Sequence, residues 1–307
     1  MDRLDMRAIS KEFGGVAALG RAQFSARAGE VHALMGENGA GKSTLMKILA
    51  GAYTHDSGEI RIDGAPVSIA SPQDAIRNGV SIIYQEFSLA RHLTVAENIL
   101  IETLGHGFLV DRRAMRARAA ELLAGMGFDD IDPNAIAGDL TVAHQQVVEI
   151  CKALSRDCSI LVLDEPTAVL TNLETEKLFR LVRRLREDGV CIVYISHRLD
   201  EIFSLCDRVT VLKDGATVGT WEIAALDHKS LVNLMIGREL KDFFPARNAT
   251  PGPVALAVEN LAAGPLVSGV SFEVRQGEVL GIGGLVGAGR PGTLRASYTC
   301  SPRAATP

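Results

Sequence analysis

The sequence has few cysteines, and none is placed as a disulfide framework or a metal site would require. The 307-residue chain contains five, at positions 151, 158, 191, 206 and 300. No two of them form a Cys-x-x-Cys pair, and His144 does not lie at ligand spacing from any of them. We therefore expect reduced, structural thiols, consistent with a cytosolic compartment.

Long apolar runs and an excess of positive charge are also missing. No run approaches the roughly 18 residues that a membrane-spanning helix needs, and residues 1–5 lack the apolar core of a secretory signal. If the protein serves a membrane process, we expect it to act from the cytoplasmic face, attached to other chains. A formal net charge of −5 gives no electrostatic reason to expect a nucleic acid as partner.

Part of the sequence occurs twice. Residues 24–31, FSARAGEV, are echoed by residues 272–279, FEVRQGEV, and small residues of 36–41 recur in 284–289 at the same offset of 248. A period of this length indicates a duplicated domain, not a solenoid. One unit should therefore contain about 250 residues, the offset between the two copies.

The composition predicts the domain boundaries. Residues 1–245 form the first domain, and residues 246–253, rich in Pro, Gly and polar side chains, predict a linker. Residues 254–290 start a second copy, in which 280–283 should be a strand without a sheet to join. Residues 291–307 show neither helical nor strand periodicity, so we expect an irregular, disordered tail, typical of a truncated or out-of-frame end.

Apolar strands alternate with helical segments in the first copy. This alternation predicts a doubly wound α/β core with a parallel sheet. The expected strands are residues 31–35, 160–163 and 191–195, and the expected helices are 42–49, 112–126 and 144–154.

The strongest motif lies between a predicted strand and a predicted helix. It fits Gly-x-x-x-x-Gly-Lys-Ser, in which glycines let successive N–H groups point at phosphate oxygens and the helix adds its positive end. Lys42 should reach the β- and γ-phosphates, and the Ser43 hydroxyl should bind Mg²⁺. The motif and the residue after it are Gly36, Glu37, Asn38, Gly39, Ala40, Gly41, Lys42, Ser43 and Thr44.

A second motif follows the apolar strand 160–163, where Asp164 and Glu165 come next. Ligands bind at the carboxyl ends of strands in such sheets. Asp164 should hold the magnesium shell, and Glu165 should polarise the attacking water as general base. Alone, the pair could be a helix cap.

Three further residues gain meaning from their order. By itself Gln85 would be a surface amide, Phe13 a core residue, and His197 a structural histidine. Their order with the two motifs, from Phe13 through 36–44, Gln85 and Asp164–Glu165 to His197, resembles that of the ATP-binding subunits of ABC transporters. The resemblance covers about residues 4–242.

The resemblance implies a fold and several roles. The fold is an α/β P-loop NTPase with an ABC-type core, made of a parallel sheet plus an antiparallel β-subdomain, and a helical subdomain over about residues 87–156. Phe13 would stack on adenine. Gln85 would join the magnesium site and couple it to the membrane subunit. His197 would contact the γ-phosphate and the attacking water, and residues 168–171 would be the D-loop.

A narrower resemblance concerns the tandem ATPases of bacterial monosaccharide importers. It rests on residues 35–44, 164–172, 194–202 and 235–240. It implies ATP and Mg²⁺ as cofactors, and a place at the cytoplasmic face of the plasma membrane as a peripheral subunit. The partners would be membrane permease subunits, a second ATP-binding domain and, indirectly, a periplasmic sugar-binding protein. No nucleic acid is expected.

The signature loop departs from the family pattern, which is close to Leu-Ser-x-Gly-Gln. In such proteins this loop caps the γ-phosphate held by a partner domain. Ala143 adds a Cβ where close approach to phosphate favours glycine, so this half-site should be weaker, unless it is the degenerate site of the pair. The loop consists of Leu140, Thr141, Val142, Ala143 and His144.

A second departure is the short second copy, which lacks the later motifs. Three hypotheses follow. The chain is the ATPase subunit of a sugar importer in truncated form, or a nucleotide-binding product with little ATPase activity, or a soluble ABC-type ATPase acting on ribosomes or DNA. The third usually has two complete domains or a coiled-coil insertion, and neither is seen.

Overall fold

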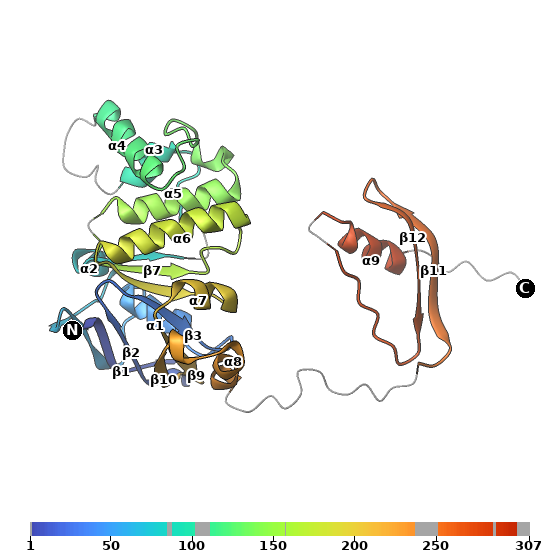
Figure 1. Ribbon diagram of the computed structural model, residues 1–307, viewed down its shortest axis with the longest axis horizontal. Coiled ribbons are helices and arrows are strands. Elements are labelled where there is room, and N and C mark those ends of the chain that lie inside the picture. The colour runs from blue at the N-terminus through green and yellow to red at the C-terminus, as the bar shows by residue number, and fades with distance from the viewer. Residues whose placement is uncertain are drawn as a thin grey trace, which may run out of the picture. The chain divides into compact units, whose positions relative to one another are not determined.

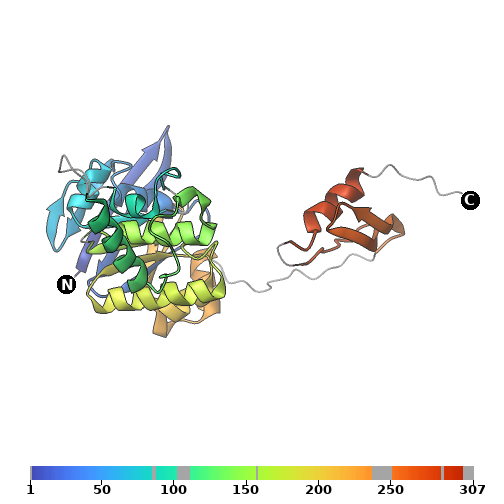
Figure 2. The same cartoon turned by 90° about the horizontal axis from the view of Figure 1, so that it is seen from above.

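The computed structural model describes residues 2–84, 88–101, 111–156, 158–236, 251–284 and 287–299. The chain divides into two compact units, Met1–Leu240 and Lys241–Pro307, each of which is considered by itself (Figures 1 and 2). This division falls five residues before the predicted boundary at 245. Of the predicted linker, 246–253, residues 246–250 lie outside the described residues and residues 251–253 lie within them.

A six-stranded sheet forms the centre of the first unit. Its four parallel pairings join β9, β3, β8, β7 and β6, and β10 pairs antiparallel to β9 at one edge. All residues of β3 and β8 are buried, because helices and the second sheet cover both faces. In sheet order the strands are β10 (Ala216–Glu222), β9 (Arg208–Lys213), β3 (Val31–Met35), β8 (Cys191–Ile195), β7 (Ile160–Asp164) and β6 (Val80–Ile83).

A second, antiparallel sheet confirms the predicted β-subdomain. Its order is β2 (Val16–Arg27), β1 (Asp2–Phe13), β4 (Ser57–Ile62) and β5 (Ala65–Val67). One apolar cluster joins this sheet, the central sheet and helix α1 (Lys42–Leu49), whose buried side chains lie on one face. This packing fixes α1, and therefore the loop before it, between the two sheets.

Helices cover the other face of the central sheet. Helices α3 (Val95–Leu100), α4 (Arg112–Gly125) and α5 (Val142–Leu154) lie together at one end of the unit (Figure 1) and share an apolar cluster with β7, β8 and α6 (Asn172–Glu187). They form the predicted helical subdomain, of which residues 87 and 102–110 lie outside the described residues. The remaining helices are α2 (Pro72–Arg77), α7 (Leu199–Leu205) and α8 (His228–Ile236).

The second unit differs from the sequence prediction in two places. Its hairpin of β11 (Val254–Ala263) and β12 (Val267–Arg275) is followed by a helix, α9 (Arg290–Thr299). The predicted irregular tail is therefore wrong for residues 291–299. Helix α9 begins at the same offset of 248 from α1 as the rest of the repeat, and buried Ala296 packs it on the hairpin.

The predicted strand at 280–283 is also wrong. The described part of the second unit contains a single sheet of two strands, and residues 280–283 are not part of it. A strand needs a neighbour to receive its backbone hydrogen bonds. Leu280 and Ile282 remain exposed, at 39% and 36% of their surface.

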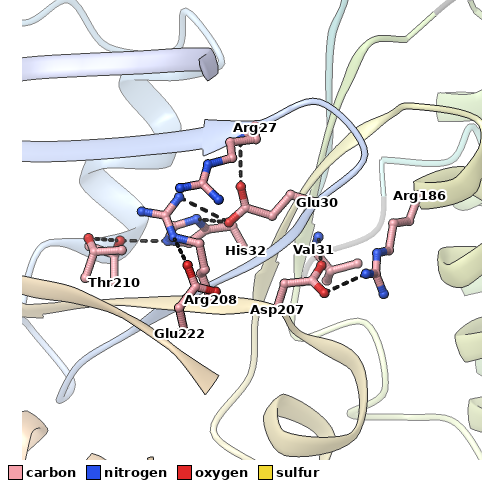
Figure 3. Close-up of polar contacts among 10 residues, drawn as sticks. Arg27, Glu30, Val31, His32, Arg186, Asp207, Arg208, Thr210 and Glu222 are labelled. Carbon is pink, nitrogen blue, oxygen red and sulfur yellow. Dashed lines mark hydrogen bonds and ion pairs between the residues drawn. The ribbon is translucent and has the colours of Figure 1, made fainter. Parts of the chain in front are cut away.

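A buried hydrogen-bonded chain lies at the end of β3 remote from the loop (Figure 3). The His32 ring contacts Glu30 Oε1 through Nδ1 at 2.9 Å and Thr210 Oγ1 through Nε2 at 2.7 Å, and Thr210 contacts Thr220 at 2.8 Å. A neutral imidazole with its proton on Nδ1 donates to Glu30 and accepts from the Thr210 hydroxyl. The Thr210 oxygen can then accept from the Thr220 hydroxyl. Arg208 lies 3.4 Å from the same Glu30 oxygen.

This hydrogen-bonded network predicts that the stability of the protein falls in acid. Burial lowers the pKa of His32, opposed by Glu30. Burial acts to raise the pKa of Glu30, but hydrogen bonds from His32 and the Arg27 N–H, together with the Arg208 charge, hold it below its usual value. Both folded pKa values are depressed, so the unfolded chain binds more protons. The stabilisation is complete above about pH 6.5, and the His32 part is lost as the pH falls below that value, followed by the Glu30 part below about 4.5.

We expect His32→Gln to be less stable at every pH and to lose less stability on acidification. One proton changes the free energy of unfolding by at most about 1.4 kcal/mol per pH unit. Urea unfolding at pH 7.5, 6.5 and 5.5 measures this slope, with Glu222, which faces Arg208 at 3.6 Å, changed to Gln as a control on the same network. An unchanged slope in His32→Gln would show that other groups cause the pH dependence.

Candidate active site

The loop between β3 and α1 needs glycine at two positions. Gly36 has φ of +151°, and a Cβ there would lie 2.3 Å from the Leu212 backbone oxygen. Gly41, the N-cap of α1, has φ of +100°, and a Cβ there would lie 2.9 Å from the Ala18 oxygen. The loop is thus closely packed against β2 and β9, which leaves its other side open to a ligand.

Lys42 closes this loop on itself. Its Nζ donates to the backbone oxygens of Gly36 at 2.8 Å and Glu37 at 3.0 Å. Burial lowers the Lys42 pKa, while Asp164 and Glu165 act to raise it. The ammonium is therefore bonded to the loop and shares a cavity with the two carboxylates, where it can exchange carbonyl partners for the oxygens of an anion.

A cavity of about 260 Å³ lies beside this ammonium. It joins the loop and the start of α1 to the carboxyl ends of β7 and β8, as the motif order predicted. Its lining residues are Ala18, Asn38, Gly39, Gly41, Lys42, Ser43, Thr44, Asp164, Glu165 and Ile195.

The two carboxylates differ in environment. Burial and the neighbouring Glu165 raise the pKa of Asp164, and Lys42 and Lys47 oppose the shift. Glu165 has φ of +49°, which is uncommon for a residue other than glycine and costs about 1 kcal/mol or more. Its N–H donates to the Ile195 oxygen at 2.9 Å. This bond holds the strained residue beside β8.

His197 meets Glu165 at the edge of the cavity. Its Nδ1 lies 3.2 Å from Glu165 Oε1, and 69% of its side chain is exposed. The two residues predicted to be catalytic therefore come together although they follow different strands, β7 and β8. Gln85, predicted as a further catalytic and metal-binding residue, lies outside the described residues.

Phe13 lies outside the cavity lining. It is 41% exposed and packs edge-on against Tyr53, with ring centroids 5.1 Å apart. Lys47 Nζ lies 5.6 Å from the Tyr53 centroid, so the aromatic pair adjoins α1. No sequence pattern points to Tyr53, whereas Lys47 could have been noted from its place on the same helix as Lys42.

The loop 140–144 is not part of the described cavity lining. Thr141 is the N-cap of α5, and its hydroxyl accepts from the His144 N–H at 3.2 Å. The His144 ring lies 3.6 Å from Asp130, and Val142 is 49% exposed. The loop therefore begins a helix, as expected, and its residues do not line this cavity.

These residues fit a nucleoside triphosphate with Mg²⁺. The loop has backbone donors, a lysine and a helix N-terminus for phosphates, and the Ser43 hydroxyl and Asp164 are oxygen ligands. No described group of three or more His, Cys, Asp or Glu could hold a metal ion by itself. Magnesium typically takes one or two protein oxygens and completes its shell with phosphates and water. The fold and the cavity together define a P-loop nucleoside triphosphatase.

Comparison with known proteins places this class more narrowly. The model of the ABC transporter family matches residues 19–168, so the first unit contains a domain of this family. It is 49% identical over 304 residues to the ribose import ATP-binding protein RbsA of Chromobacterium violaceum, covering 99% of this chain and 61% of that protein. It is 50% identical to a putative ribose/galactose/methyl galactoside import ATP-binding protein of Rhizobium meliloti, covering 95% and 58%. The chain thus spans only about three-fifths of these relatives, as the 61% and 58% show.

Solved structures confirm the fold. The ADP conformation of the ATP-binding cassette MJ1267 has a TM-score of 0.67 at 25% identity, covering 78% of this chain and 100% of that one. A dimeric post-hydrolysis state of the cassette MJ0796, bound to ADP and Pi, has a TM-score of 0.64 at 25% identity, covering 72% and 98%. No helix of the described residues is long and apolar enough to cross a membrane.

Proposed function

We propose that this chain binds Mg-ATP and hydrolyses it, as the energy-supplying subunit of a bacterial sugar importer. The observation that carries the proposal is the single cavity that joins Lys42, Ser43, Asp164 and Glu165, with His197 at its edge. The family and the relatives named above support it. Phe13, beside Tyr53, would stack on the adenine.

The residues suggest how the phosphates are held. Lys42 would exchange its hydrogen bonds to the Gly36 and Glu37 oxygens for hydrogen bonds to phosphate oxygens. The exchange costs little free energy, because the ammonium makes charge-assisted hydrogen bonds in both cases. Ser43 and Asp164 would hold Mg²⁺, which supplies charge neutralisation at the phosphates when bound. Occupied by a cation, the site would favour the ionised form of Asp164 against its raised pKa.

Hydrolysis would depend on the Glu165–His197 pair. Glu165 accepts the proton of the attacking water, and His197, 3.2 Å from that carboxylate, fixes its direction and contacts the γ-phosphate. The exposed side chain of His197 indicates a site that is open on this side. A second ATP-binding domain would close it with a loop equivalent to residues 140–144.

The transport partners are part of the same proposal. The chain would lie at the cytoplasmic face of the membrane, bound to permease subunits, while a periplasmic protein delivers the sugar. Tyr84 and Ser88, the described residues on either side of 85–87 in the sequence, line part of a groove. In the family resemblance, Gln85 couples the site to the membrane subunit. We propose this groove as the permease contact.

The test begins with the purified chain. We expect Mg-ATP binding and slow hydrolysis, because in a dimer of these 307 residues the trans-acting loop is the altered 140–144 loop. Adding the permease in proteoliposomes should raise the rate. Absence of Mg-ATP binding would refute the proposal. Co-purification with ribosomes instead of a permease would favour the soluble ATPase, and binding without turnover in any assembly would favour an inactive nucleotide-binding product.

A further inference from the structure

A buried carboxylate beside the active site has no part in the mechanism above. Glu201, in α7, is 5% exposed, yet four groups donate hydrogen bonds or charge to it. Oε1 receives Thr167 Oγ1 at 2.7 Å and Arg198 Nη1 at 2.9 Å. Oε2 receives the Tyr194 hydroxyl at 2.8 Å and Ser196 Oγ at 2.9 Å.

The carboxylate is well satisfied in this position. Arg198 provides the opposite charge, and three hydroxyls occupy further lone pairs, as a buried anion requires. Burial and the nearby Glu201 raise the pKa of Tyr194, so its hydroxyl stays protonated and remains a donor. Ser196 Oγ also accepts from the Arg198 N–H at 3.1 Å, which ties the network to the backbone.

Three of the four donors lie in the two turns that carry the catalytic pair, and the fourth, Tyr194, lies in β8 directly before the second turn. Thr167 is two residues after Glu165, on the turn that follows β7. Ser196 and Arg198 are the residues before and after His197, between β8 and α7. Glu201 therefore bonds to both sides of His197 and to the segment after Glu165.

We infer that Glu201 is a positioning residue, which holds His197 against Glu165 for hydrolysis. The inference rests on the proposed function. The His197 side chain is 69% exposed, so packing around the ring does little to fix its position. Glu201 is not part of the described lining of the ATP cavity, so it should affect the chemical step and leave the hold on ATP unchanged.

The variant Glu201→Gln keeps the size of the side chain and removes the charge that pairs with Arg198. We expect kcat to fall about 10- to 100-fold, the range that a misplaced catalytic group produces, while KM and the Kd of Mg-ATP stay within about threefold. Asp200→Asn is the matched control, since Asp200 is the preceding residue and its side chain is 100% exposed. It should match wild type. If Glu201 only stabilised α7, thermal stability would fall and kcat per folded molecule would not, which would overturn the inference.

A double-mutant cycle separates positioning from an independent effect. If Glu201 acts through His197, Glu201→Gln should lower kcat by less than about twofold in a His197→Ala background, because the side chain that Glu201 positions is gone. Equal losses in both backgrounds would overturn the inference. Glu201→Asp, which keeps the charge on a shorter side chain, should recover part of the rate.

A spectroscopic measurement does not depend on turnover. The imidazole nitrogen resonances of His197, one of seven histidines, can be assigned with His197→Ala and compared with Glu165→Gln, which removes the partner charge. We expect Glu201→Gln, but not Asp200→Asn, to shift them in the direction that Glu165→Gln does. If wild type hydrolyses no faster than Glu165→Gln, the proposed function fails, while these resonances still decide on the positioning role. Unmoved resonances would refute it.

Discussion

Glu165→Gln is expected to lower the rate of ATP hydrolysis by about 100- to 10,000-fold, the usual contribution of a general base. The amide keeps the shape of the side chain and cannot accept the proton of the attacking water. Single-turnover assays with excess protein and γ-labelled ATP measure the loss even when the wild-type rate is low.

Binding of Mg-ATP should survive this change. Glu165 raises the pKa of Asp164, so removing its charge makes Asp164 easier to ionise and removes repulsion toward the phosphates. We expect the Kd to be unchanged or lower, measured by titration calorimetry. Glu176→Gln, an exposed position on α6, is the control and should match wild type. A rate within about fivefold of wild type in Glu165→Gln would place the general base elsewhere.

Lys42→Ala should weaken Mg-ATP binding by about 10- to 150-fold, because a hydrogen bond to a charged group contributes about 1.5–3 kcal/mol. The ammonium is the cation between the loop and the carboxylates, held by the Gly36 and Glu37 oxygens. Its loss leaves Asp164 and Glu165 without this nearby positive charge, which further disfavours an anionic ligand.

The Kd is best measured in the Glu165→Gln background, where the ligand is not consumed. Lys229→Ala, at an exposed position of α8, removes the same charge from a residue that does not line the cavity and should bind as its parent does. Circular dichroism of Lys42→Ala should be unchanged. Binding within about threefold of the parent would mean that the loop holds ATP mainly through its backbone donors.

Much of the site could be read from local sequence, because its chemistry needs contiguous residues. A phosphate loop requires particular backbone angles and a lysine at a fixed spacing, so Gly36 through Ser43 predicted the cavity wall. Apolar strands followed by Asp164 and His197 predicted the opposite side of the site, since parallel strands present their carboxyl ends at one edge. The family and its α/β fold followed from the order of these motifs.

Local periodicity failed where packing determines the structure. Residues 290–299 form a helix although their sequence has little amphipathic pattern, because Ala296 packs on the hairpin. Residues 280–283 have the composition of a strand, but they form no strand in the described part of the second unit, because no neighbouring strand receives their hydrogen bonds. Phe13 meets Tyr53 only through the turn of the chain after α1.

By itself the sequence determined the class of protein and the groups that would hold phosphate and magnesium, since each lies in a short motif with its own backbone geometry. Only the tertiary structure decided which distant groups meet. It placed Glu201 against Thr167, 34 positions away in the chain, and joined His32 to Thr210, 178 positions away. Strand pairing and burial set such contacts, because a buried polar group must find its partners wherever the fold brings them.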